Sequence, residues 1–111
     1  MSEFNISTDS EQNKILLNIQ GDITGESEST LKNHFTNELS EQKDVILDFE
    51  NVNYINSAGI ATIISMMRLS EEKKIRMLIA RPSKHVQKVI ETVGLNDFLK
   101  IYDSLESALQ A

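Results

Sequence analysis

The sequence predicts a single α/β domain built on a mixed sheet of four to five strands with about four helices. Three observations lead there. Apolar residues alternate with a period of two near the start of the chain and later repeat at helical spacing. A strand, a helix and a second strand follow one another between Val45 and Ala80, the order of a βαβ unit with parallel strands. The length of 111 residues suffices for one core, so we expect one domain over residues 1–111.

Two strands are expected before the first helix. Apolar alternation is weak over residues 4–8 and clear over residues 15–19, and Gly21 ends the second run. The short polar segment 9–13 joins the two runs. We therefore expect an antiparallel pair.

Residues 24–39 predict the first helix, because Leu31, Phe35 and Leu39 form one apolar stripe. Residues 45–49 are continuous enough to form a buried strand. A second helix follows Ser57. Its expected apolar stripe consists of Ile60, Ile63, Ile64 and Met67, with Met66 at its flank.

The remaining elements are shorter. Residues 75–80 predict the strand that completes the βαβ unit. Ser83 can cap a third helix, and Gly94 stands where a glycine commonly ends one. The apolar positions of that helix are Val86, Val89, Ile90 and Val93. Residues 101–102 predict a last strand, and Ser104 can cap a final helix.

Composition excludes several classes of function. The chain has no cysteine, so thiolate catalysis, disulfides and cysteine metal sites are ruled out. A net charge of −6 makes it a poor nucleic-acid binder. The basic residues of the second half are read as a solvated helix end and loop rather than a binding patch: Arg68, Lys73, Lys74, Arg76 and Arg81. No apolar run reaches membrane-spanning length and residues 1–14 lack a signal-peptide core, so we expect a cytoplasmic protein without membrane insertion.

The turn between the buried strand and the second helix is the most informative segment. It places the hydroxyl of Ser57 at a helix start, where unpaired N–H groups and the positive end of the helix dipole favour an anion such as phosphate. A structural alternative is that Ser57 only caps the helix. Gly59 is expected to permit close backbone packing.

The ordered segments of the chain resemble the STAS domain, the fold of bacterial anti-sigma factor antagonists. The segments are IQGDI (19–23), VILDF (45–49), INSAGI (55–60) and VIETVGL (89–95). The resemblance covers nearly the whole chain and implies that Ser57 is a phosphorylation site. It also implies a partner-binding surface that consists of Asp22, Thr24, Asn56, Ser57, Ala58 and Gly59. Asn56 stands where the family usually has Asp, and Thr24 where it often has a second acidic residue.

The resemblance implies an anti-sigma factor antagonist that is not itself an enzyme. The unphosphorylated form would bind an anti-sigma factor that is also a serine kinase and release a sigma factor. Phosphorylation of Ser57 would end binding, and a phosphatase would restore it. The alternative is a STAS scaffold or adaptor subunit of a stress-signalling assembly or of a lipid-transport ABC complex. The oligomeric state stays open between a monomer and a weak dimer.

Other candidate chemistry is weaker. A histidine phosphocarrier is disfavoured, because neither His34 nor His85 stands at a helix start with an arginine beside it. Asp48 and Glu50 share one face of a strand end, yet no acid or base partner accompanies them. No phosphate-binding glycine loop is present in the sequence. We therefore expect no cofactor, no metal and no catalytic residue.

Overall fold

The structure, a computed structural model, describes residues 4–111. Within them, five strands form one mixed sheet that is accompanied by four α-helices and three 3₁₀ turns. The strands are β1 (Asn5–Glu11), β2 (Lys14–Gln20), β3 (Val45–Asn51), β4 (Met77–Ala80) and β5 (Lys100–Tyr102). The helices are α1 (Glu28–Glu38), α2 (Ser57–Glu72), α3 (Lys84–Thr92) and α4 (Leu105–Leu109). The 3₁₀ turns are η1 (Gly25–Ser27), η2 (Leu39–Glu41) and η3 (Leu95–Asp97).

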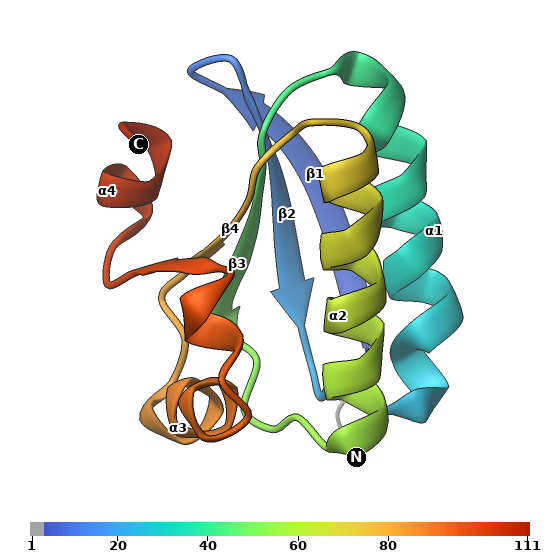
Figure 1. Cartoon of the computed structure of the whole chain (residues 1–111), viewed down its shortest axis with the longest axis vertical. Coiled ribbons are helices and arrows are strands. Elements are labelled where there is room, and N and C mark those ends of the chain that lie inside the picture. The colour runs from blue at the N-terminus through green and yellow to red at the C-terminus, as the bar shows by residue number, and fades with distance from the viewer. Residues whose placement is uncertain (1–3) are drawn as a thin grey trace.

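The strands lie in the sheet in the order of the sequence, β1-β2-β3-β4-β5. β1 is antiparallel to β2, and all other pairs are parallel. The predicted antiparallel pair and βαβ unit are therefore confirmed. From β2 onward, each connection leads to the neighbouring parallel strand, always toward the same edge of the sheet. Because such crossovers are right-handed, their helices all lie on one face of the sheet. α1 and α2 indeed lie side by side on one face (Figure 1).

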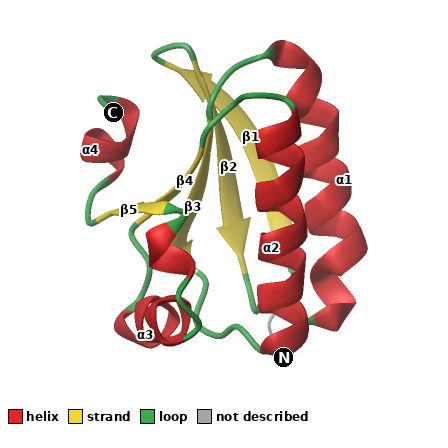
Figure 2. Cartoon of the chain, in the orientation of Figure 1, coloured by secondary structure: helices red, strands yellow, loops and turns green. Residues whose placement is uncertain are grey.

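Two apolar cores stabilise the fold. The larger core lies between the sheet and helices α1, α2 and α3, and Leu47 and Phe49 of β3 point into it. The smaller core lies on the opposite face, where α4 packs over Ile46 and Leu78. α4 covers only part of that face (Figure 2). The carboxyl end of β3 is therefore left uncovered on that side.

Three predicted details were wrong in position. Met66 is completely buried and Met67 only partly, because the buried stripe of α2 runs through Ile63, Met66 and Ser70. The strand expected from residue 75 begins at Met77. The helix expected over residues 24–39 is divided into η1, α1 and η2.

The apolar positions predicted for the third helix differ in their burial. Val86 and Ile90 are buried, but Val89 is half-buried and Val93 is about half exposed, at 51%. The apolar positions of α3 therefore divide between the core and the surface.

Candidate functional site

The segment before α2 is fixed by backbone hydrogen bonds to the loop after β2. Ile23 and Ile55 form a parallel bridge. The N–H of Ile23 donates to the carbonyl oxygen of Tyr54 at 2.9 Å, and the N–H of Asn56 donates to that of Ile23 at 3.2 Å. These bonds bring two segments that are about thirty residues apart to the same edge of the domain and hold the start of α2 there.

Gly59 is required by this close approach. A Cβ atom at this position would overlap the carbonyl oxygen of Ile23 and would lie 2.8 Å from its carbonyl carbon. Both atoms belong to the backbone, which cannot move aside cheaply. The expected close packing at Gly59 is therefore confirmed.

Asn56, not Ser57, caps α2. Its backbone is extended, and its Oδ1 atom accepts a hydrogen bond from the N–H of Gly59 at 2.9 Å. Asparagine thus performs the capping role that the usual aspartate could perform, without the negative charge. The alternative in which Ser57 is the structural cap is contradicted by this geometry.

Ser57 is the first residue of α2 and is exposed. Within residues 4–111 its hydroxyl makes no hydrogen bond to the protein. The N–H of Gly59 is taken by the cap and that of Ile60 by the carbonyl oxygen of Asn56, at 2.9 Å. The N–H groups of Ser57 and of the exposed Ala58 lie in the first turn of α2, and the helix has no carbonyl group before them that could accept their hydrogen bonds. An anion on Ser57 would therefore meet unused donors.

The other predicted surface residues lie on the same edge but do not bond to Ser57. Thr24 caps η1, accepting a hydrogen bond from the N–H of Glu26 at 3.2 Å. A Cβ on Gly25 would be 3.5 Å from the Cβ of Ala58, so the start of η1 packs against the start of α2. Asp22 is half-buried just before Ile23. In the described part of the chain, neither Asp22 nor Thr24 has a side-chain hydrogen bond to Ser57.

A shallow groove that the sequence did not predict lies beside Ser57. It has a volume of about 420 Å³ and separates the start of α2 from α3. Ser57 and Ile60 line one side, Val89 and Val93 the other, with Tyr54 between them. We call these five residues the α2–α3 groove. The only sequence signal for it is the surplus of valines on α3.

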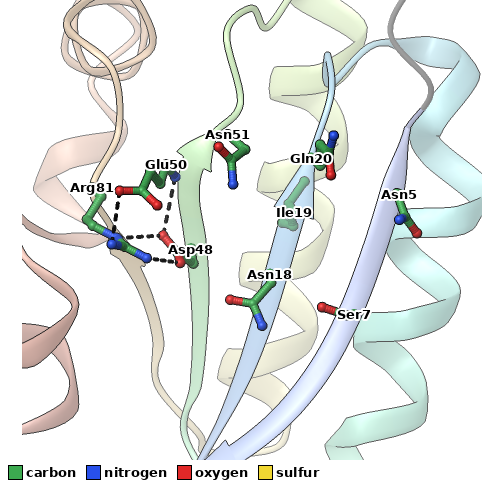
Figure 3. Close-up of a pocket in the computed structure, with 9 residues that line it drawn as sticks. All are labelled: Asn5, Ser7, Asn18, Ile19, Gln20, Asp48, Glu50, Asn51 and Arg81. Atoms are coloured by element: carbon green, nitrogen blue, oxygen red, sulfur yellow. Dashed lines mark hydrogen bonds and ion pairs between the residues drawn. The ribbon is translucent and has the colours of Figure 1, made fainter.

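A second hollow lies on the uncovered face of the sheet, at the carboxyl ends of β2 and β3 (Figure 3). Its volume is about 300 Å³ and its lining is polar. Arg81 lies at one side and bonds to both carboxylates that the sequence placed on one strand face. Its Nε donates to Oδ1 of Asp48 at 3.1 Å and its Nη2 to Oδ2 at 2.5 Å, while Nη1 donates to Glu50 at 3.0 Å.

These contacts explain why Asp48 is tolerated in a buried position. Its side chain is only 6% exposed, and Arg81 satisfies both carboxylate oxygens. The hydrogen bond to Asp48 raises the pKa of Arg81, burial opposes this, and the charges of Asp48 and Glu50 add to the rise. Arg81 has a left-handed backbone, with φ at 55°, that its ion pairs help to hold. The arrangement is an ion cluster in which one arginine bonds to two carboxylates.

Arg76 and the two histidines are each engaged in a contact of their own. Arg76 pairs with Asp44 at 2.8 Å and also donates to the carbonyl oxygen of Ala111. His34 contacts its own helix through the carbonyl oxygen of Thr30. His85 is exposed and stacks on Tyr54, with ring centroids 5.9 Å apart and planes 5° apart.

Two kinds of feature are absent from residues 4–111. No group of three or more histidine or acidic side chains there could hold a metal ion. No helix in the same range is both long and apolar enough to cross a membrane.

Solved structures with the same fold were found. An anti-sigma factor antagonist from Mycobacterium paratuberculosis matches with a TM-score of 0.87 and 13% identity, over 97% of this chain and 92% of that one. The anti-sigma factor antagonist SpoIIAA in its unphosphorylated form matches with a TM-score of 0.71 and 16% identity, over 96% and 93%. The Bacillus cell fate determinant SpoIIAA in the phosphorylated form matches with a TM-score of 0.71 and 17% identity, over 97% of each chain. At these identities the likeness concerns the fold.

The family model for the STAS domain matches residues 5–108, which is nearly all of the chain. The order of its strands and helices agrees with that match. The chain therefore belongs to the STAS domain family.

Proposed function

We propose that this chain is an anti-sigma factor antagonist that is controlled by phosphorylation of Ser57. In its unphosphorylated form it binds an anti-sigma factor that is also a serine kinase, and a sigma factor is released. The kinase then phosphorylates Ser57 and binding ends, until a phosphatase removes the phosphate. The chain acts in the cytoplasm and performs no catalysis of its own.

The observation that carries this proposal is the free hydroxyl of Ser57 at the first position of α2. Asn56 has taken the capping role, so Ser57 has no structural duty that its modification would disturb. The adjacent N–H groups and the helix dipole favour a phosphate there. The family match of this chain, together with solved structures of the same fold that are described as anti-sigma factor antagonists, supports the same function.

The mechanism of the switch follows from charge. A phosphate adds about −1.5 to −2 charges and three acceptor oxygens. α2 can hold it locally, so the domain keeps its fold. A partner that covers Ser57 must instead desolvate the phosphate or meet it with its own acidic groups. A loss of about 1.4 kcal/mol in that interface weakens binding tenfold.

The test is phosphorylation of the purified chain by its anti-sigma factor kinase with ATP, followed by intact-mass and peptide mass spectrometry. We expect one phosphate on Ser57. The Ser57→Ala variant should take none. Ser83→Ala is the matched control, because the Ser83 hydroxyl already accepts a hydrogen bond from Val86, and this variant should be labelled as the wild type is. Phosphate at another position would overturn the assignment of Ser57. Stable binding to a partner without phosphorylation would favour the scaffold or adaptor alternative.

A further inference from the structure

Exposed apolar side chains gather close to Ser57. Three large apolar residues in the range 4–111 are exposed: Tyr54 at 45%, Val93 at 51% and Phe98 at 71%. Tyr54 and Val93 both line the α2–α3 groove, where Ser57 stands. An exposed apolar cluster of this kind marks an interaction site more often than isolated apolar residues do.

The groove continues along α3. Another hollow, of about 300 Å³, adjoins the α2–α3 groove and shares Val89 and Val93 with it. His85 and Lys88 complete its wall. His85 stacks on Tyr54, which lines the α2–α3 groove, so the two hollows are joined through this pair of rings.

The apolar surface also extends along α2. Ser57, Ala61, Ile64 and Arg68 follow one another at helical spacing, so they share one face, on which Ile64 is half-buried and the other three are exposed. A further hollow of about 420 Å³ on this helix is lined by Ala61, Ile64 and Leu69, and also by Ser65, Arg68 and Glu72. The face that begins at Ser57, in the α2–α3 groove, therefore leads along α2 to this hollow.

The α3 side of this surface carries a positive charge. Lys88 lines the hollow on α3, which has no acidic residue in its lining, whereas on α2 Arg68 shares its hollow with Glu72. Within residues 4–111 Lys88 forms no ion pair, in contrast to Arg76 and Arg81. Its charge is therefore available to a partner with a carboxylate at the matching position.

We propose that this surface binds an amphipathic helix of the anti-sigma factor kinase, with apolar side chains in the α2–α3 groove and a carboxylate toward Lys88. This inference rests on the proposed function and extends its partner surface from the start of α2 onto α3. An amphipathic helix, which carries apolar side chains on one face and charged ones beside them, fits a shallow apolar groove that is flanked by a cation. A phosphate on Ser57 would then be buried among apolar contacts and close to acidic ones, so both effects oppose binding.

The test compares the binding of five variants to the kinase by titration calorimetry. Val93→Asp and Lys88→Glu should each weaken binding by at least about tenfold, as residues central to an interface commonly do. Phe98→Ser is the control for Val93, because Phe98 is exposed but does not line the groove. Lys84→Glu is the control for Lys88, since it makes the same charge change on the same helix, outside the hollow. Both controls should bind within about twofold of the wild type.

The fifth variant, Ser57→Asp, separates the two proposals. If it weakens binding while Val93→Asp and Lys88→Glu bind as the wild type does, the α3 surface is wrong and the switch at Ser57 stands. If Lys84→Glu weakens binding as much as Lys88→Glu, the partner senses only net charge and the proposed groove is wrong. If the wild type does not bind the kinase, the proposed function fails and this surface fails with it. Circular dichroism of each variant checks that the fold is kept, which the exposure of all five positions leads us to expect.

Discussion

The carbonyl group of Ile23 occupies the space that a side chain on Gly59 would need. This contact joins the loop after β2 to the first turn of α2, and it leaves no alternative to glycine. We expect Gly59→Ala to lower the free energy of unfolding by about 1–3 kcal/mol or more, because a backbone atom must move. Chemical denaturation measures the loss.

Gly25→Ala is the matched control for that prediction. A Cβ on Gly25 would meet the Cβ of Ala58 at 3.5 Å, an ordinary contact. Its effect should stay within about 0.5–1 kcal/mol. Equal stability of Gly59→Ala and the wild type would show that the two loops can separate without cost.

The cap at Asn56 predicts a difference between two adjacent residues. Asn56→Ala should lower the unfolding free energy by about 1 kcal/mol, because the N–H of Gly59 loses its acceptor. Ser57→Ala should change it by less than about 0.5 kcal/mol, since the exposed hydroxyl bonds to nothing in the described chain. Asn56→Asp should keep the stability. Thermal and chemical denaturation of the three variants decide the matter, and a larger loss from Ser57→Ala than from Asn56→Ala would contradict the assigned cap.

Arg81 should contribute far more stability than Arg76. Arg81→Met leaves the buried Asp48 without a partner, and we expect a loss of roughly 2–3 kcal/mol. Arg76→Met removes a pair in which the arginine is 53% exposed, and its loss should be below about 1 kcal/mol. Urea denaturation of both variants measures the difference. Similar losses would mean that solvent screens the Asp48 pair as well.

Phosphorylation of Ser57 should not unfold or rearrange the domain. The phosphate would lie beside the N–H groups of the first turn and the positive end of α2, which adds about 0.3–1 kcal/mol to the unfolding free energy. The thermal midpoint of the phosphorylated protein should therefore equal or slightly exceed that of the unmodified protein. Amide NMR shifts should change around residues 56–59 and stay constant in β4. A lower midpoint, or shifts throughout the sheet, would contradict a local switch.

Periodicity predicted most of the fold. The alternation in β2, the apolar run in β3 and the stripe in α2 each report which side chains are buried. They were therefore enough for the antiparallel pair, the βαβ unit and the position of Ser57 at the start of a helix. The choice between Met66 and Met67 failed because both are apolar and adjacent, and only packing against the sheet decides which one is buried.

Contacts between distant residues could not be read from the sequence. Arg81 meets Asp48 only because β3 and β4 pair with Asp48 opposite Ala80. Tyr54 meets His85 only because α3 returns to the start of α2. Local patterns in the sequence carry no information on either of these two contacts. The spacing of the apolar residues of α3 likewise does not tell that Val86 is buried and Val93 lies at the surface.

The unbonded hydroxyl of Ser57 has a consequence for the lifetime of the protein. Proteases act on the small unfolded fraction of a protein, and that fraction depends on the free energy of unfolding. A modification that breaks no internal contact and meets free N–H groups does not enlarge this fraction. If Ser57 is phosphorylated as proposed, the phosphorylated form should be degraded no faster than the unmodified one, so a cell could keep it as a reserve and recover the unmodified form by dephosphorylation without new synthesis.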